Sequence, residues 1–277
     1  MRLFSYGSYF SRLRALVGLS GAIRFSLAHL RHKLFPPQKG ALARVPVGRY
    51  VFYFPSLPYF EGLFTEIFFK ETYYLARTDA PIRVIDCGAN IGVSLLYIKV
   101  RAPLARVICF EPNPAARAVL EKNVIANEWQ KEVQVLPYAL GKSKGVATFF
   151  VDEKDATSSA GGTVPYKKND KRELRSYPVD VDTLSQHING NVDFLKMDIE
   201  GREFDVLEEA AAAGSLKHVA TLQLEYHYIP KFFPRPLSEM LALLESAGFH
   251  TFVKANTDPH SIVGRDVLHT YMLFAWR

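Results

Sequence analysis

The sequence has few cysteines, no long apolar runs, and no acidic side chain within its first 60 residues. Only two cysteines, Cys87 and Cys109, occur among 277 residues, and their spacing suggests neither a disulfide framework nor a zinc site. No apolar run reaches the length that a membrane-spanning helix needs. We therefore expect a protein of a reducing compartment, the cytoplasm, without a thiolate metal centre.

The absence of acidic residues from residues 1–60 divides the chain into two parts of opposite net charge. Residues 1–60 hold nine of the 34 lysines and arginines and no acid, which leaves 25 bases against all 28 acids in residues 61–277. We therefore predict a basic N-terminal extension, residues 1–60, followed by one large domain, residues 61–277. The extension should contact an anionic surface, either lipid or nucleic acid. For residues 1–35 two readings stay open: a helix packed on the domain, and peripheral contact with a membrane surface.

Apolar segments of strand and helix length alternate through the domain. This alternation predicts an α/β fold with a seven-stranded, mostly parallel sheet covered by helices on both faces. The chain also shows an aromatic-rich helix before the sheet and a polar, glycine-containing insertion within it. The predicted strands are 48–54, 82–86, 106–111, 133–140, 146–151, 193–198, 219–226, 249–254 and 268–276, and the predicted helices are 61–76, 92–100, 114–127, 203–213 and 237–246.

A glycine turn with an acid on either side marks the predicted ligand site. Asp86 ends the first strand of the domain, Gly88 and Gly92 shape the turn, and Glu111 ends the next strand. An acid at that second position accepts hydrogen bonds from ribose hydroxyls. Asn90 stands where a dinucleotide fingerprint needs glycine, and no phosphate-binding lysine follows. These features favour S-adenosylmethionine, which is cationic and carries no phosphate, over a nicotinamide cofactor; the alternative is that both acids are merely structural.

Four runs of residues carry a recognisable pattern: 84–92 (VIDCGANIG), 110–114 (FEPNP), 139–141 (ALG) and 194–201 (FLKMDIEG). Together they resemble the FkbM-type S-adenosylmethionine-dependent methyltransferases. The resemblance implies a Rossmann-like class I methyltransferase fold and O-methylation of a sugar, glycolipid or natural-product hydroxyl, and it does not reach residues 1–60. By the same resemblance, Asp86, Gly88, Asn90 and Gly92 would surround the methionine part of the cofactor, Glu111 would hold the ribose, and Ala139 with Leu140 would lie near the adenine.

Candidate catalytic residues stand at the ends of the next two strands. Asp198 ends one strand, and Glu225 and His227 end its expected neighbour, so the three should share one crevice. They would form either an acid–base group or a divalent metal site. We favour Asp198 or His227 as general base without a metal, because a third clear carboxylate ligand is lacking. Each also has a structural reading, and for Glu200 and Glu203 we prefer a role at the positive end of the following helix.

Two other classes of function remain open: a nucleic-acid methyltransferase, and a non-catalytic cofactor-binding module. The fourth strand lacks the Asn/Asp-Pro-Pro-aromatic turn that holds a flipped base, and the domain is net acidic. We therefore expect a small-molecule or glycan- or lipid-linked hydroxyl acceptor and no nucleic acid. Residues 155–162 are rich in hydroxyls and glycine, which suits a polyhydroxylated substrate, a lid, or a disordered surface loop.

Overall fold

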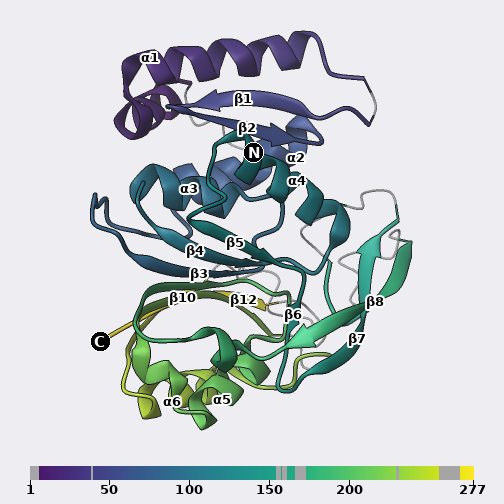
Figure 1. The fold of residues 1–277 in the computed structure, drawn as a ribbon, viewed down its shortest axis with the longest axis vertical. Coiled ribbons are helices and arrows are strands. Elements are labelled where there is room, and N and C mark those ends of the chain that lie inside the picture. The colour runs from purple at the N-terminus through teal and green to yellow at the C-terminus, as the bar shows by residue number, and fades with distance from the viewer. Residues whose placement is uncertain are drawn as a thin grey trace.

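The computed structural model describes residues 6–38, 40–153, 157, 161–165, 173–228, 231–255 and 269–277. Its layers are stacked, with one long helix on top, then a β-hairpin, a helical layer, the main sheet and a second helical layer (Figure 1). The helices are α1 (Tyr6–Leu34), α2 (Leu57–Phe64), α3 (Val93–Arg101), α4 (Pro114–Ala126), α5 (Glu203–Ala212) and α6 (Leu237–Ser246), with single turns η1 (Thr65–Phe69), η2 (Leu184–His187) and η3 (Ser215–His218). The strands are β1 (Ala43–Val47), β2 (Tyr50–Phe54), β3 (Arg83–Cys87), β4 (Arg106–Phe110), β5 (Val133–Leu136), β6 (Ala139–Leu140), β7 (Gly145–Asp152), β8 (Leu174–Asp182), β9 (Val192–Met197), β10 (Val219–Tyr228), β11 (His250–Ala255) and β12 (His269–Trp276).

The main sheet has seven strands in the order β11-β12-β10-β9-β3-β4-β5. The neighbours from β10 to β5 are parallel, and β12 runs antiparallel to both β10 and β11. The chain starts the sheet at β3, builds outward through β4 and β5, and then returns to place β9 on the other side of β3. A reversal of this kind opens a ligand crevice at the carboxyl ends of the two central strands. The predicted α/β fold is confirmed.

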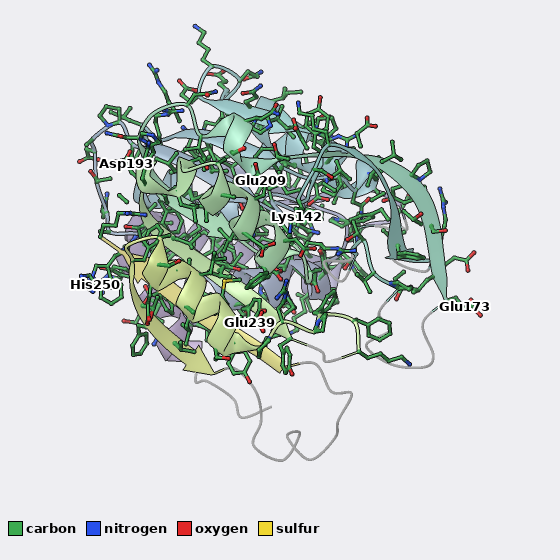
Figure 2. The ribbon with its side chains drawn as sticks, turned by 90° about the horizontal axis from the view of Figure 1, so that it is seen from below. Lys142, Glu173, Asp193, Glu209, Glu239 and His250 are labelled. Atoms are coloured by element: carbon green, nitrogen blue, oxygen red, sulfur yellow. The ribbon has the colours of Figure 1, made fainter. Side chains whose placement is uncertain are left out.

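Two apolar cores cover the two faces of this sheet. One core joins the sheet to α3 and α4, and continues through α2 and the β1–β2 hairpin to α1. The other joins the sheet to α5 and α6, which Figure 2 shows from below, with Glu209 on α5 and Glu239 on α6. Because both faces are covered, the central strands are apolar almost throughout, and a charged residue within them needs a buried partner.

The predicted strand 133–140 is wrong as one element. It breaks at Pro137, which has no N–H to give to a sheet ladder. The chain pairs as β5 up to Leu136, and then leaves the main sheet and joins a second sheet of order β6-β8-β7 as β6. The strand β8 was not predicted, because its alternation is interrupted by Pro178 and several of its side chains are exposed.

The predictions around residue 60 also need correction. The single strand predicted at 48–54 is one arm of a hairpin, whose turn uses the positive φ of Gly48. The helix predicted at 61–76 begins earlier and ends at Phe69, after the π-helical turn η1. This wider turn lets the consecutive side chains of Ile67, Phe68 and Phe69 all be buried.

The N-terminal extension is docked on the domain by side-chain amides of α4. Asn123 accepts a hydrogen bond from Tyr53 N (2.7 Å) and donates to Tyr53 O (3.0 Å) and Ile91 O (3.0 Å). Asn127 makes the same pair of bonds with Val51, each 2.8 Å long. The inward face of α1 packs in turn on the hairpin and on α2, where Phe25 stacks on Phe64. The division at residue 60 stays a prediction, and α2 runs across it.

Candidate active site

The carboxyl ends of β3 and β9 meet at Gly88. The amide of Asp198 donates to Cys87 O (3.0 Å), so the chain leaving β9 lies directly against the turn that follows β3. A Cβ on Gly88 would fall 1.8 Å from the carbonyl oxygen of Asp198, and the φ of Gly88 is +81°. Only glycine fits such a close approach of two backbones. The first half of the glycine turn is therefore fixed by the strand that carries the candidate catalytic acid.

The second half of the turn is shaped by Asn90 and Gly92. Asn90 has a positive φ of 49°, and its side-chain oxygen accepts a hydrogen bond of 2.6 Å from the hydroxyl of Tyr59 on α2. Its side-chain nitrogen donates to the backbone oxygen of Thr157 (3.3 Å), which belongs to the polar insertion. Gly92, with φ +94°, starts α3, and a Cβ there would lie 2.8 Å from Leu120 Cδ1. Two segments outside the sheet thus hold the turn at Asn90. The rest of loop 155–162, apart from Gly161 and Gly162, lies outside the described residues.

Asp86 lies beneath the turn and is fully buried. Its carboxylate is 3.2 Å from Lys196 Nζ and accepts a hydrogen bond of 2.6 Å from the hydroxyl of Ser94. Lys196, at the position paired with Asp86 in the ladder, also donates to Gly88 O (2.7 Å). Burial alone lowers the pKa of Lys196, but Asp86 and Asp198 outweigh it and raise that pKa above its usual value. The pair supports the turn from below, and direct contact of Asp86 with a cofactor stays a prediction.

Glu111 follows β4 and lies beside the turn. Its two carboxylate oxygens each accept one backbone hydrogen bond, from Asn90 N (2.7 Å) and from Asn113 N (2.8 Å). Each oxygen keeps a second acceptor position, as a pair of vicinal ribose hydroxyls requires. Burial raises the pKa of Glu111 to about 7, although the two backbone hydrogen bonds oppose the rise. Ribose binding by Glu111 stays a prediction that this geometry favours.

Ala139 and Leu140, predicted near the adenine, form β6 beyond the end of β5. They pair with Val181 and Asp182 of β8, and both are buried, Ala139 in the small sheet's core and Leu140 in the core below the main sheet. Their backbone stands on the same side of the molecule as the end of β5. Their contact with an adenine stays a prediction.

Asp198, Glu225 and His227 are brought together as the strand ends predicted. Leu224 of β10 is paired with Met197 of β9, so Asp198 and Glu225 are the next residues along these two neighbouring strands. Burial, followed by the charge of Asp198, raises the pKa of Glu225 to about 8. The hydroxyl of Tyr73, from the segment between η1 and β3, donates to Asp198 Oδ2 (3.3 Å). At pH 7 the Glu225 carboxyl is therefore mostly protonated beside Asp198.

His227 is held between two acids that sequence reasoning assigned to the helix end. Its Nδ1 is 2.9 Å from Glu203 Oε1, and its Nε2 is 3.5 Å from Glu200 Oε2. Glu203 is fully buried and also accepts hydrogen bonds from the backbone amides of Ile199 and Gly201. Burial lowers the pKa of His227, but Glu203 and Glu200 raise it well above its usual value. The two acids therefore favour the protonated form of His227.

Of the structural alternatives, the described contacts bear out only the place of Glu203 at the start of α5. The N-cap of α5 is Arg202, and no side chain of the described residues caps that helix, so Asp198 is not its cap. Arg202 pairs with Asp205 at 3.0 Å and not with Glu225. Glu203 does stand in the first turn of α5, but its carboxylate is turned to His227.

Asp198, Glu200 and His227 also offer ligand atoms that all lie within 4.8 Å of one another. Glu200 reaches this group from a left-handed backbone position, with φ 56°. Such a group can hold a cation or can bind and deprotonate a hydroxyl. The interpretation without a metal stays a prediction. The contact between His227 and Glu200 is compatible with that interpretation, because the two side chains pair with each other without a metal ion.

Sequence reasoning missed the residues that support the site from behind. Lys196 could have been found, because a lysine inside the apolar run 194–197 must have a buried acid as its partner. Tyr59 and Tyr73 carry no comparable signal, since each reaches the site from a segment far away in the sequence. In the sequence Glu203 is an acid in the first turn of a predicted helix, and only the folded structure shows that His227 lies beside it.

The charges of this edge fit S-adenosylmethionine. Asp198 supplies a carboxylate suited to a sulfonium or an ammonium, and Glu111 suits a ribose. Lys196, the base that β9 brings here, is engaged by Asp86 and Gly88 O and so is not offered to a phosphate.

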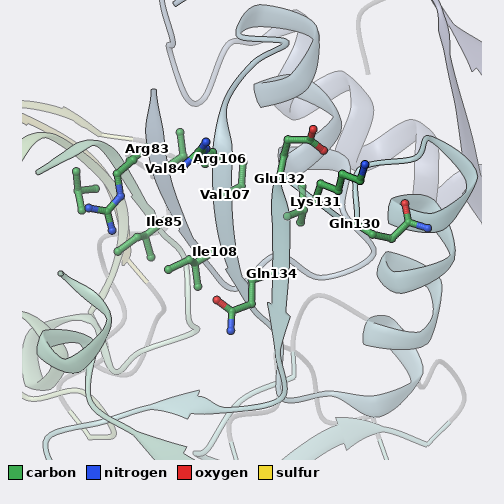
Figure 3. A pocket seen from close by; sticks show the side chains of 12 residues that line it. Arg83, Val84, Ile85, Arg106, Val107, Ile108, Gln130, Lys131, Glu132 and Gln134 are labelled. Atoms are coloured by element: carbon green, nitrogen blue, oxygen red, sulfur yellow. The ribbon is translucent and has the colours of Figure 1, made fainter. Parts of the chain in front are cut away.

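A pocket of about 270 Å³ lies elsewhere, at the amino ends of β3, β4 and β5 (Figure 3). Arg83, Arg106 and Glu132 mark the starts of these strands, at the opposite end of the sheet from Gly88. We assign it no part in the chemistry.

A seven-stranded sheet of this order, with a glycine turn and strand-end acids at its reversal point, defines the class: a Rossmann-like class I methyltransferase. The comparison with family profiles is narrower, because the Methyltransferase FkbM domain matches residues 86–251. This chain belongs to the FkbM methyltransferase family. S-adenosylmethionine is its cofactor.

Among curated proteins, the chain is similar to methyltransferase sdnD of Sordaria araneosa, with 29% identity over 53% of this chain and 67% of that protein. It is similar to methyltransferase 1 of Beauveria bassiana, with 28% identity over 53% of this chain and 66% of that protein. Among solved structures, the FkbM methyltransferase of Methylobacillus flagellatus is 19% identical, with a TM-score of 0.48, over 76% of this chain and 47% of that one. The chain thus spans about two thirds of these curated relatives and under half of that solved chain.

Proposed function

We propose that this protein is an O-methyltransferase that transfers the methyl group of S-adenosylmethionine to a hydroxyl of a sugar, glycolipid or natural-product acceptor. The observation that carries the proposal is the group of Asp198, Glu225 and His227 at the carboxyl edge of the sheet, directly beside the turn at Gly88. A hydroxyl is a weak nucleophile and gains from a group that takes its proton. This edge places such a group next to the cofactor's turn.

We assign cofactor binding to the turn and its neighbours. Gly88, Asn90 and Gly92 present backbone to the methionine part, and Glu111 accepts the ribose hydroxyls through its two remaining acceptor positions. Asp86 holds the turn from below through Lys196. Ala139 and Leu140 keep the adenine side of the crevice apolar.

We assign proton transfer to Asp198. Glu203 and Glu200 favour the protonated form of His227, so we assign His227 the role of positioning these acids. Glu225, mostly protonated at pH 7, offers the acceptor a donor as well as an oxygen lone pair. When bound, S-adenosylmethionine supplies a methyl group on a sulfonium sulfur. Asp198 would take the hydroxyl proton as the acceptor oxygen took the methyl group and the departing sulfur kept the carbon–sulfur electron pair.

The test compares Asp198→Asn with Asp205→Asn, a half-exposed acid on the adjoining helix. Each variant is incubated with S-adenosylmethionine and a panel of sugars, glycolipids and polyols, and released S-adenosylhomocysteine is measured. We expect Asp198→Asn to lower turnover at least about 100-fold while calorimetry shows S-adenosylhomocysteine still bound, because a positioned base contributes roughly 10²–10⁴-fold. The Asp205→Asn control should keep full turnover.

Three outcomes would contradict parts of this proposal. Methyl transfer to RNA or DNA with none to the panel would replace the acceptor class. Tight cofactor binding without release on any acceptor would indicate a non-catalytic module. Loss of turnover after dialysis against EDTA, restored by Mg²⁺, would assign Asp198, Glu200 and His227 to a metal and overturn the metal-free proton transfer.

The proposal includes a cytoplasmic location with peripheral membrane contact through residues 1–35. Among the described residues, no helix has both the length and the apolarity to span a bilayer. The support for surface contact comes from the exposed face of α1.

A further inference from the structure

The second segment of α1 exposes a row of large apolar side chains. After a break in helical geometry at Gly18, residues 19–34 form one helical segment of about 24 Å. At about 100° per residue, the five exposed apolar side chains of this segment fall within a stripe roughly 80° wide. We call them the leucine stripe: Leu19 (52% exposed), Ile23 (44%), Leu27 (63%), Leu30 (50%) and Leu34 (63%).

The leucine stripe is distinct from the face that holds α1 on the domain. The packing face carries Ala22 and Phe25, both buried, and His29, which is 2.5 Å from Glu61 of α2. Among the described residues, twelve large apolar side chains are exposed, and residues 19–35 contain half of them. Their concentration on one face of one helix separates this surface from singly scattered apolar residues, which need no explanation.

Basic side chains border the stripe on both sides. Arg31 projects at one margin and Lys33 at the other, and both are exposed, whereas Arg24 donates a hydrogen bond to Gly48 O (2.8 Å) in the hairpin turn. Residues 1–60 contain nine bases and no acid, whereas the rest of the chain is net negative. An apolar stripe between basic margins on a helix too short to span is the pattern of a helix that lies in a membrane interface. Figure 1 shows α1 at one end of the stacked layers, with its far side away from the sheet.

We propose that α1 docks this protein on an anionic membrane surface, with the leucine stripe among the acyl chains and Arg31 and Lys33 at the lipid phosphates. Both interpretations of residues 1–35 then hold: one face of α1 packs on the domain, and the opposite face contacts the membrane. A second copy of this chain is disfavoured as the occupant, because two such basic segments would repel each other across a shared interface.

The docking helix is connected to the active site through η1. The hydroxyl of Tyr9 donates to Thr65 Oγ1 (3.4 Å), the guanidinium of Arg12 donates to Phe69 O, and the Tyr9 ring packs on Phe69 with centroids 4.3 Å apart. Tyr73, a few residues beyond η1, is the hydrogen-bond partner of Asp198. These contacts come from the part of α1 before Gly18, and the segment that carries the leucine stripe reaches the start of η1 through Phe25, which stacks on Phe64.

Flotation of the full chain with vesicles tests this proposal without any methyl acceptor. Vesicles of phosphatidylcholine alone are compared with vesicles that also contain phosphatidylglycerol, at low and high salt. We expect binding to the anionic vesicles that weakens as salt rises, because screening acts on the basic margin. The double variant Leu27→Glu/Leu30→Glu should bind at least about tenfold more weakly, and Arg31→Gln/Lys33→Gln should lose affinity for the anionic vesicles alone.

Val146→Glu is the matched control, because Val146 is 70% exposed on β7, far from α1 in the chain. It should bind vesicles as the unchanged protein does, and circular dichroism checks that every variant is folded. Equal binding to both vesicle types, no binding by the folded protein, or equal binding by Leu27→Glu/Leu30→Glu and Val146→Glu would each overturn the proposal. So would a dimer, detected by light scattering, that the leucine-stripe variant dissociates.

Discussion

At the residue scale, Glu111 combines burial with two backbone hydrogen bonds, and burial raises the pKa of its carboxyl to about 7. Ribose hydroxyls donate to the ionised carboxylate, so ligand binding requires that form. Below pH 7 the free protein takes up a proton at Glu111, and this proton must leave before the ligand binds. Affinity for S-adenosylhomocysteine should therefore fall as pH drops through 7, by up to about tenfold for each further pH unit. Calorimetry from pH 5.5 to 8 measures this.

Two variants separate Glu111 from the other acid that titrates nearby. Glu111→Gln should weaken binding by about 10–100-fold at pH 8, because it replaces charge-assisted hydrogen bonds by neutral ones. It should also remove the dependence around pH 7. Burial raises the pKa of the Glu225 carboxyl to about 8. The Glu225→Gln variant should therefore keep the fall in affinity around pH 7. A Glu111→Gln protein with unchanged affinity and slope would refute ribose binding at this position.

Gly88 makes the other residue-scale prediction. Gly88→Ala should lower the free energy of unfolding by more than about 3 kcal/mol, because its Cβ would overlap the carbonyl oxygen of Asp198 at a positive φ. Gly62→Ala is the control, since Gly62 lies in α2 with open space around its Cα. That variant should melt at an unchanged or slightly higher temperature. Similar urea midpoints for the two variants would show that the turn can move away from β9.

At the scale of elements, α4 holds the N-terminal hairpin through Asn123. Asn123→Ala leaves backbone groups of Tyr53 and Ile91 without partners inside a dry contact, and should cost about 2–4 kcal/mol. Hydrogen exchange should then rise across residues 43–54 and stay unchanged in β9. Ile125→Ala, on the exposed side of α4, should leave exchange as it was. Uniformly faster exchange would show instead that the hairpin and sheet unfold together.

Elements with a strong local signal were predicted closely. The apolar spacing of 237–246 and the glycine after it gave α6 its observed bounds, and the apolar runs gave the central strands within a residue or two. The failures have local causes that a pattern of hydrophobicity does not record. Pro137 splits one strand, the π-helical turn η1 ends a helix early, and β8 is too exposed to look like a strand.

At the scale of the whole molecule, the sheet order follows from the alternation of strands and helices, but most of the site does not. Asp198, Glu225 and His227 could be placed together because parallel strands end at one edge. The partner of Asp86 on β9 and the tyrosines that reach Asn90 and Asp198 depend on side chains folded back from other layers. Such contacts between distant segments leave no trace in local spacing.

The place of β12 between β10 and β11 bears on how the chain is made. While the ribosome is still adding residues 256–276, β10 has β9 on one side and an open hydrogen-bonding edge on the other. Its buried leucines, Leu222 and Leu224, then lack the cover that β12 gives. Until β12 pairs with it, β10 therefore keeps an open hydrogen-bonding edge, and such an edge favours self-association.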